Sequence, residues 1–384
     1  MAMEEIEIPD IDQLRTMTSV KWTRDDPDVL PAWVADMDIR PPAAVVEALQ
    51  GVLDRRDFGY NRRAVQALPD TFARWQQAHH GWAVDPAEVR MFCDVLHAID
   101  VALWLHTEPG DGVILLTPIY PPFLVALESS KRRLVDVPLD PDGWRLDPDR
   151  LRAAVDPGTK AILLCNPHNP TGRVFDQAEL RAIADIAIEH DLLLLSDEVW
   201  GDLVYPGSTH QPLAALGPEV AAQTVTISSV SKAFNLAGLR CAVAHLGHQG
   251  MASQIEALPG HLLGAVSTPG AEAALAAWTE GEEWLQDVRR HLAGRRDQLA
   301  ARLGADLPQV GFQIPQATYL AWLDFRPLGL GDAPNERLLE VGRVALSPGS
   351  AFGPLGDGFA RLNFATSELI LDEILDRIVS AIGG

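Results

Sequence analysis

The chain from Lys160 to Asp197 reads KAILLCNPHNPTGRVFDQAELRAIADIAIEHDLLLLSD. It opens and closes with short runs rich in leucine and β-branched residues, over 160–165 and 192–196. Between these runs, Gln177 to Glu189 carries apolar residues at helical spacing and follows a capping Asp176. Continuous apolar strands that alternate with helices are typical of a parallel sheet buried on both faces. The stretch therefore predicts a strand–helix–strand unit of an α/β protein.

The same alternation extends in both directions, from about Asp94 to Leu246, and predicts three more strands, namely Gly112 to Leu116, Thr224 to Ser228 and Arg240 to Leu246. A helical region follows from Met251 to about Leu303, with breaks at Pro259 and Pro269. The last part has an α+β pattern. Its predicted elements are the strands Tyr319 to Asp324, Arg343 to Leu346 and Phe359 to Phe364, and a closing helix from Glu368 to Ile382.

These patterns predict a two-domain organisation. We expect a large domain over residues 46–284 with a mostly parallel central sheet. We expect a smaller α+β domain over 285–384, and an N-terminal segment, 1–45, that joins the smaller domain. The sequence shows no internal repeat and no low-complexity linker.

Composition excludes several classes of protein. The chain has 384 residues, 47% of them hydrophobic, with 31 basic against 53 acidic side chains and a formal net charge of −22. This length and apolar content suit a folded protein with a real core rather than a disordered chain. The negative charge repels nucleic-acid phosphates and anionic membranes, so we expect neither as a partner.

Cysteine and histidine usage gives no sign of disulfides or metal. The three cysteines, Cys93, Cys165 and Cys241, have no CxxC spacing, and the histidines show no metal-binding pattern. The chain begins MAMEEIE, without the basic and apolar regions of an export signal, and no apolar run approaches the roughly 18 residues of a membrane span. We expect a cytoplasmic protein.

The stretch from Ser228 to Arg240, SSVSKAFNLAGLR, carries the most chemistry. A single lysine after a buried strand usually extends to solvent. Here Lys232 lies between small hydroxyl residues and an arginine, and Ser229, Ser231 and Arg240 are suited together to hold a phosphate. A lysine beside a phosphate site indicates a Schiff base to pyridoxal 5′-phosphate (PLP).

Two further residues match the needs of that cofactor. Asp197 ends a predicted strand, where a carboxylate would keep the pyridine nitrogen protonated; it could instead cap the next helix. Asn169, in NPHNPTG, could donate to the phenolate oxygen, although such a segment by itself marks only a turn. Lys232, Asp197 and Asn169 thus follow three consecutive predicted strands, at the edge where open α/β sheets bind ligands.

The chain has three further segments of note: WVADMD at 33–38, IYPPF at 119–123, and SAFG at 350–353 followed by FARLN at 359–363. With the lysine and asparagine motifs, they resemble the fold-type I PLP enzymes of the class I/II aminotransferase group over nearly the whole chain. Within that group, the sequence is most similar to the cystathionine β-lyase-like C–S lyase branch, for which the segment 33–38 is specific.

The resemblance implies roles for more residues. Tyr120 resembles the aromatic residue stacked on the cofactor ring, Arg361 the residue that binds the substrate carboxylate, and Tyr60 the tyrosine that reaches the phosphate in the neighbouring subunit of a homodimer with shared active sites. Without it, the two tyrosines would be ordinary half-buried aromatics, and Arg361 could equally form an exposed salt bridge. It further implies a phosphate site at the amides of Val95 and Leu96, and substrate contacts by Asn169, Ala35 and Asp36.

The sequence departs from the branch pattern at three positions that touch the cofactor. Asp94 stands where relatives carry glycine, which puts a negative charge beside the phosphate. Trp200 stands where the group has tyrosine or histidine, and its indole donates a hydrogen bond but cannot accept one. Arg240 follows the aminotransferase pattern.

The resulting hypothesis is a PLP-dependent C–S β-lyase that cleaves cystathionine or another cysteine S-conjugate to a thiol, pyruvate and ammonia. The alternative enzyme is an aminotransferase, or a decarboxylating or oxidative variant, acting in a biosynthetic pathway. A third reading is a non-catalytic PLP-binding regulator, which the intact lysine and the lack of a basic DNA-binding segment disfavour.

Overall fold

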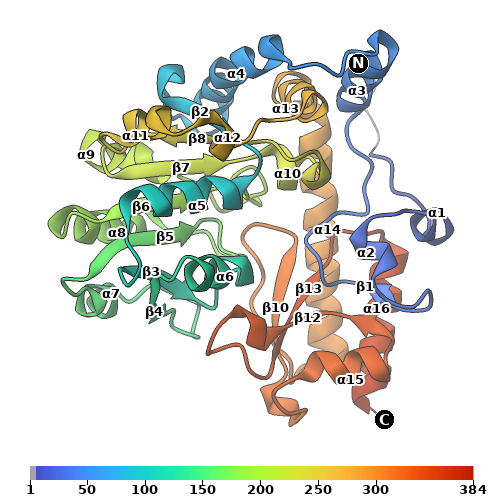
Figure 1. Cartoon of the computed structure of the whole chain (residues 1–384). Coiled ribbons are helices and arrows are strands. Elements are labelled where there is room, and N and C mark those ends of the chain that lie inside the picture. The colour runs from blue at the N-terminus through green and yellow to red at the C-terminus, as the bar shows by residue number, and fades with distance from the viewer. Residues whose placement is uncertain (1–5, 384) are drawn as a thin grey trace.

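The computed structural model describes residues 6–383; the first residues of the chain, on which the expectation about export partly rests, lie outside this range. A seven-stranded sheet dominates Figure 1, with strand order β2-β8-β7-β6-β5-β3-β4. Strands β3 to β7 pair in parallel, and β8 runs antiparallel to both of its neighbours. The bounds are β2 Val89–Phe92, β3 Gly112–Thr117, β4 Arg133–Pro138, β5 Thr159–Cys165, β6 Leu193–Asp197, β7 Thr224–Ser228 and β8 Ala242–Leu246.

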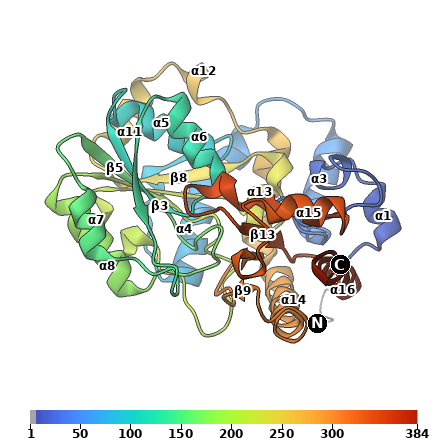
Figure 2. The ribbon, with the colours of Figure 1, turned by 90° about the horizontal axis from the view of Figure 1, so that it is seen from below.

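Helices cover both faces of this sheet, as Figure 2 shows. Side chains alternate between the faces of a strand, so Leu163 of β5 belongs to the same apolar cluster as Ile99 of α5, whereas Leu164 belongs to the cluster of Leu180 in α8. Helices α5 and α6 lie on the first face and α7 and α8 on the second. Their bounds are α5 Val95–His106, α6 Pro121–Ser129, α7 Pro148–Ala154 and α8 Gln177–Glu189.

A second, antiparallel sheet has the strand order β12-β13-β10-β9. Its strands are β9 Gly311–Phe312, β10 Leu320–Asp324, β12 Ser347–Pro348 and β13 Phe359–Asn363. Helices α14 Glu282–Asp306, α15 Pro334–Glu340 and α16 Glu368–Gly383 belong to this part, and α14 extends from it toward the larger sheet (Figure 1). The N-terminal segment joins it through β1 Leu30–Pro31, which pairs in parallel with β11 Val344–Ala345.

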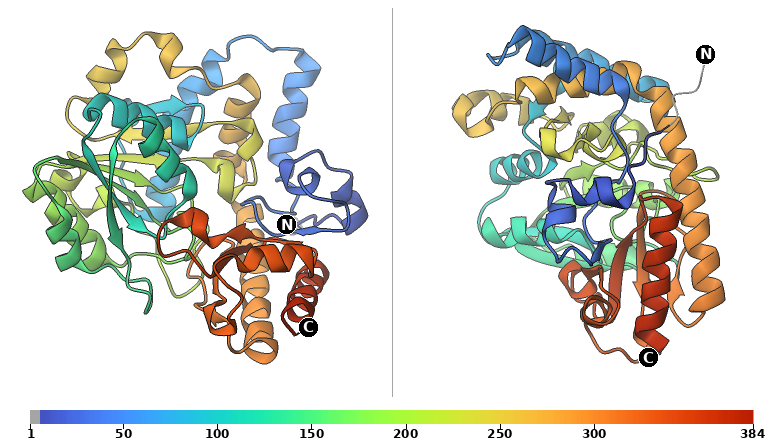
Figure 3. Two further views of the ribbon diagram at one scale, coloured as in Figure 1. Left: turned by 60° about the horizontal axis from the view of Figure 1, so that its bottom comes forward. Right: turned by 90° about the vertical axis from the view of Figure 1, so that its right-hand side faces the viewer.

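The remaining helices lie outside the groups described above. The long helices α3 and α4 pack against α13, at the top of the molecule in the right-hand view of Figure 3. Helices α1 and α2 lie in the N-terminal segment, beside the second sheet. The bounds are α1 Ile11–Arg15, α2 Val20–Thr23, α3 Ala43–Arg55, α4 Arg62–His80, α9 Pro218–Ala221, α10 Val230–Ala233, α11 Met251–Ala257, α12 Gly260–Leu263 and α13 Thr268–Glu280.

The α/β fold with a mostly parallel sheet is confirmed, and most predicted strands are correct to within one or two residues. One prediction of detail was wrong. The strand expected from Arg240 begins at Ala242, because Arg240 has a left-handed backbone with φ +55°. The break predicted at Pro269 is present over residues 264–267, with Pro269 in the first turn of α13 directly after it, and a further break occurs at Gly281, between α13 and α14.

The predicted domain boundary between residues 284 and 285 falls inside α14, which is one continuous helix, so this division stays a prediction. No helix among residues 6–383 is both long enough and apolar enough to cross a membrane.

Candidate active site

Three strand ends of the large sheet meet around one cavity. Cys165 at the end of β5 pairs with Asp197 at the end of β6, and Asp197 pairs with Ile227 of β7. The chain segments that leave these strands therefore emerge side by side. They line a cavity that is open to solvent, with about 800 Å³ of empty space when its open mouth is included. Its lining includes Lys232, Asp197, Asn169, Tyr120, Trp200, Ala35, Ser229, Ser231, Arg240, Val95 and Leu96, so the structure brings together most of the predicted site.

The loop after β5 holds Asn169 in one orientation. His168 is fully buried, and desolvation lowers its pKa to about 3, so the ring is neutral at physiological pH. Its Nδ1 pairs with the Thr171 hydroxyl at 2.8 Å. The Asn169 Oδ1 accepts a hydrogen bond of 2.9 Å from Arg361 Nη1. Because arginine only donates, this bond directs the Asn169 amide group away from Arg361 and leaves it available as a donor in the cavity.

Asp197 is a buried carboxylate that few neighbouring groups stabilise. Its Oδ1 accepts from the Val199 amide at 3.1 Å, the one hydrogen bond to this carboxylate among residues 6–383. Desolvation raises its pKa to about 7, and the charge of Glu198 acts in the same direction. A cationic N–H group beside Asp197 would reverse this effect, so the site fits the protonated pyridine nitrogen of PLP.

Lys232 lies on the short helix α10 and points back across the cavity. Its Nζ donates to the Ala35 carbonyl at 2.8 Å and lies 5.8 Å from the centre of the Trp200 ring. Burial lowers the pKa of Lys232, although the nearby Asp36 acts in the opposite direction. A lowered pKa increases the fraction of neutral amine at physiological pH, which both Schiff-base formation and base catalysis need.

The predicted phosphate site lies at the N-terminus of α5. Val95 and Leu96 begin this helix, so their amides lie at the positive end of its dipole. Asp94 caps the helix by accepting from the His97 amide at 2.7 Å, and it also forms an ion pair with Arg240. A carboxylate therefore lies inside the phosphate site and contacts the arginine predicted to bind the phosphate.

Ser229 and Ser231 differ in whether their hydroxyl protons are available to a phosphate. The Ser229 hydroxyl donates to the Cys241 carbonyl at 2.7 Å and accepts from the Ser231 amide at 3.1 Å. A hydroxyl has a single proton to donate, so Ser229 uses its own within the protein. The Ser231 hydroxyl has no partner among the described residues, and it is therefore the better donor for a phosphate.

Arg361 lies on β13 of the second sheet and is buried. Its Nη2 donates to the Trp33 carbonyl at 2.8 Å and to the Ser347 hydroxyl at 3.2 Å. Its Nε is buried with no partner among residues 6–383. Desolvation lowers the pKa of Arg361 to about 10, which still leaves it cationic at neutral pH. A buried cation with a free donor is suited to bind a carboxylate.

Of the aromatic residues singled out in the sequence, Tyr120 and Trp200 line the cavity, whereas Tyr60 lies on the surface. Tyr120 lines the cavity at the start of α6, with its ring 5.5 Å from that of Phe123 in a T-shaped arrangement. Trp200 is buried against Tyr319, with ring centres 4.9 Å apart. Tyr60 is fully exposed, between α3 and α4, and does not line the cavity.

Sequence reasoning missed several residues that support the site. Ser347 holds Arg361, Tyr319 donates to the Ala35 carbonyl at 2.9 Å, and Asn363 donates to the carbonyls of Val34 and Asp36 at 2.7 Å. A signal for Asn363 was available, because it follows Arg361 by two positions on one strand and so lies on the same face.

Comparison with known proteins gives the family context. A family model described as aminotransferase class I and II matches residues 34–378. Cystathionine β-lyase PatB of Bacillus subtilis is 36% identical, over 95% of this chain and 96% of the relative. Cystathionine β-lyase of Corynebacterium glutamicum is 35% identical, over 97% and 99%. The crystal structure of cystalysin from Treponema denticola, which contains PLP, superposes with a TM-score of 0.93 at 28% identity and covers 100% of this chain and 99% of its own.

Proposed function

The chain belongs to the class I and II aminotransferase family, and on that basis we propose that it is a PLP-dependent C–S β-lyase. Its proposed substrates are cystathionine or another cysteine S-conjugate, cleaved with water to a thiol, pyruvate and ammonia. The observation that carries this proposal is that Lys232, Asp197 and Asn169 line one cavity and that Arg361 is hydrogen-bonded to Asn169, in a chain about 36% identical to a cystathionine β-lyase.

The residues of the cavity fit the cofactor. Lys232 supplies the amine, Asp197 has a free carboxylate oxygen for the ring nitrogen, and the Asn169 amide is available for the phenolate oxygen. The amides of Val95 and Leu96 suit the phosphate. When bound, PLP supplies an electron sink for the negative charge that develops on the substrate α-carbon.

The protein's own groups then position the substrate and move its proton. Arg361 binds the α-carboxylate through its guanidinium, whose other donors are fixed by Asn169, Trp33 and Ser347. The Lys232 amine, once free, takes the proton from the α-carbon, and its lowered pKa suits that role. Asp197 would keep the ring nitrogen of bound PLP protonated through its negative charge. Once the α-proton is removed, a thiolate on the β-carbon would be expelled, and water would convert the remaining part of the substrate to pyruvate and ammonia.

A direct assay tests this function. The PLP-loaded protein should release pyruvate and a thiol from L-cystathionine in equal amounts. If cystathionine and a panel of other cysteine conjugates give neither product, the lyase proposal is wrong. Amino-group transfer that needs a 2-oxo acid would indicate an aminotransferase instead, and release of carbon dioxide would indicate a decarboxylating variant.

We further propose that the enzyme is a cytoplasmic homodimer with shared active sites. Support comes from Tyr60, whose side chain is fully exposed next to the exposed Phe58. Tyr60 lines a surface hollow together with Leu263 and Val266. An apolar surface of this kind suits a protein partner, and a second copy would bring Tyr60 toward the phosphate of the other subunit.

Shared sites predict complementation between two inactive variants. Lys232→Ala and Tyr60→Ala proteins, unfolded and refolded together in equal amounts, should regain about a quarter of the wild-type activity, since half of the dimers are mixed and each mixed dimer has one intact site. Each variant refolded alone serves as the control. A mixture no more active than these controls would show that Tyr60 does not act across subunits.

The ion pair between Asp94 and Arg240 predicts an effect on cofactor affinity. Asp94→Asn keeps the helix cap, because asparagine caps as well as aspartate, but it removes the negative charge from the phosphate site. We expect the Kd for PLP to fall about tenfold, as relief of one charge repulsion at a partly exposed site implies. Titration by absorbance measures it. Pyridoxal, which lacks the phosphate, should bind both proteins equally, and weaker binding of PLP to the variant would contradict the prediction.

A further inference from the structure

A segment of the N-terminal region, residues 33–38, crosses the active site; we refer to it as the strap. Its backbone carbonyls are held from several sides. The Trp33 carbonyl accepts from Arg361, the Ala35 carbonyl from Lys232 and Tyr319, and the Asp36 carbonyl from Asn363. The strap therefore contacts both the lysine and the arginine that the reaction needs.

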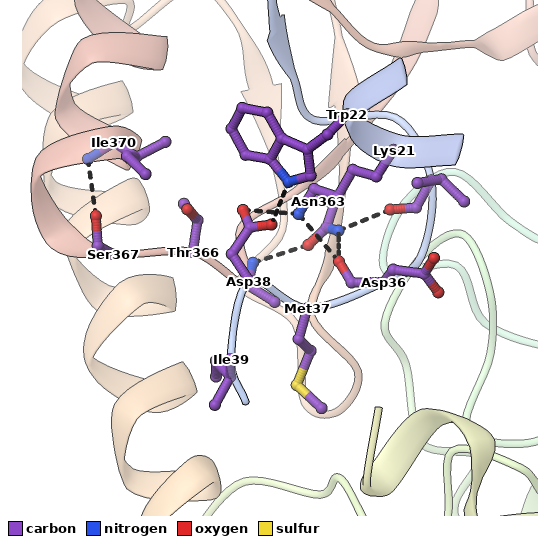
Figure 4. A network of polar contacts seen from close by, with 12 residues as sticks. Lys21, Trp22, Asp36, Met37, Asp38, Ile39, Asn363, Thr366, Ser367 and Ile370 are labelled. Atoms are coloured by element: carbon purple, nitrogen blue, oxygen red, sulfur yellow. Dashed lines mark hydrogen bonds and ion pairs between the residues drawn. The ribbon is translucent and has the colours of Figure 1, made fainter. Parts of the chain in front are cut away.

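The far end of the strap is fixed by a buried ion pair, shown in Figure 4. Lys21 Nζ lies 2.8 Å from Asp38 Oδ2, and each side chain is 3% exposed. Lys21 also donates to the Asp36 carbonyl at 3.1 Å, and the Trp22 indole donates to Asp38 Oδ1 at 2.9 Å. The Asp38 amide donates to the Ala365 carbonyl at 2.9 Å. Contacts from helix α2 on one side and from the part of the chain around the second sheet on the other thus hold the strap in place.

A buried ion pair is poor support for stability, because desolvation of the two charges cancels most of their attraction. An apolar pair of similar volume would hold α2 to the strap at least as well. The ion pair instead restricts α2 and the strap to a single relative position, because either charge is strongly destabilised when it moves away from its partner. The peptide unit that is fixed in this way, at Asp36, directly follows the Ala35 carbonyl.

The Ala35 carbonyl defines how the Lys232 amine is presented. A carbonyl oxygen only accepts, so it binds Nζ through an N–H and leaves the lone pair of a neutral amine free. Tyr319 occupies the same oxygen from another side, at 2.9 Å. The bond of 2.8 Å to Lys232 thus sets the position of the base relative to Arg361, which donates to the carbonyl of Trp33, two residues earlier in the strap.

We propose that Lys21 and Asp38 are positioning residues of the reaction, which act through the strap to place the Ala35 carbonyl as the acceptor that aims the free Lys232 amine. The proposal rests on the proposed function, in which Lys232 is the base. It assigns a role in the active site to two residues that do not line the cavity.

The test uses a variant that removes both charges together. Lys21→Met/Asp38→Asn leaves no unpaired buried charge and keeps an acceptor for Trp22, so it should fold. In the PLP-saturated enzyme, we expect kcat for L-cystathionine to fall about tenfold or more, while KM stays within about twofold, because misplacement of a reacting group reduces kcat and Arg361 keeps its contacts.

A second readout does not depend on turnover. The rate at which the cofactor-free protein binds PLP depends on the neutral fraction of Lys232, so its pH midpoint reports on that amine. The charged groups around Lys232, namely Asp36, Arg361 and Asp197, are the same in both proteins. Loss of the fixed acceptor should move this midpoint to lower pH by about half a unit, because the carbonyl favours the protonated form.

Two further variants complete the test. Arg343→Met removes an ion pair that ties the same N-terminal segment, at Asp26 and Asp28, away from the strap, and should change neither kcat nor the midpoint. Asp38→Glu keeps the ion pair but displaces the strap by a methylene, so it should lower kcat several-fold even if the double variant fails to fold.

The proposal is overturned if both strap variants keep the wild-type kcat and midpoint, or if Arg343→Met produces the same losses. Failure of the lyase proposal would look different, because the PLP-binding midpoint would still shift although no substrate gave pyruvate. Failure to bind PLP at all in the wild type would refute the proposed function itself.

Discussion

Replacing Lys232 with alanine is expected to reduce pyruvate release from L-cystathionine by about 10⁴-fold or more. The variant loses both the covalent attachment of PLP and the base that removes the α-proton, and base removal alone accounts for about 10²–10⁴. The Lys232 Nζ is the amine that the cavity places near Asp197 and Trp200.

The measurement is a pyruvate assay combined with the visible absorption spectrum of the purified protein with added PLP. The absorption band near that of a protein-bound PLP Schiff base should vanish in Lys232→Ala. Lys160→Ala is the matched control, since Lys160 lies exposed on β5, away from the cavity, and should leave both readings unchanged. A variant at Lys232 that keeps the band and the activity would refute the cofactor assignment.

Asp197→Asn is expected to have two opposite effects. It should lower kcat by about 10³-fold, because the neutral amide cannot hold the proton on the ring nitrogen and the electron sink is weakened. In the cofactor-free protein, the same change should increase stability at pH 8, because it removes a buried charge that has one hydrogen bond.

The pH dependence follows from the sign of the pKa shift. Burial raises the pKa of Asp197 from 3.8 to about 7 in the folded protein. The folded state therefore keeps this proton longer than the unfolded state, and the stability it contributes is complete below pH 3.8 and is lost as the pH rises through about 7. The loss at pH 8 is on the order of 4 kcal/mol.

Urea unfolding of the two cofactor-free proteins measures this difference. The advantage of Asp197→Asn over the wild type should be largest at pH 8 and fall to less than half of that value at pH 5. A variant that is less stable than the wild type at pH 8, or an advantage that does not change with pH, would show that the carboxylate is not held at a cost in the folded protein.

The parts of the fold that could be predicted from sequence are those with strong local signals. Strands β5, β6 and β7 are buried on both faces apart from Lys160, and the residues at or after their ends, Asn169, Asp197 and Lys232, were predicted for that reason. The edge strand β4 was missed because it alternates buried and exposed positions and carries charges such as Arg133. Strand β2, at the opposite edge, is only four residues long and carries Arg90.

The supporting residues were beyond local reasoning. Arg361 came from the family resemblance, since nothing in its own strand distinguishes it from a surface arginine. Nothing in the sequence singled out Lys21, and Asp38 stood out only as part of the segment 33–38; the packing of α2 against the strap buries the two side chains together. The hydroxyl of Ser229 was expected at the phosphate, but its bond to Cys241 depends on a contact that spacing does not reveal.

The hydrogen bond between Arg361 and Asn169 joins strand β13 of the second sheet to the loop that follows β5 of the large sheet. One partner belongs to the predicted substrate site and the other to the predicted cofactor site. Any ligand that binds the Arg361 guanidinium changes the strength of its hydrogen bond to the Asn169 oxygen. This in turn changes how strongly the Asn169 amide group donates a hydrogen bond to the cofactor. Thermodynamic linkage makes this influence reciprocal. The affinity of Arg361 for the substrate carboxylate and the hydrogen bond from Asn169 to the cofactor are therefore coupled. A substitution at either residue changes both.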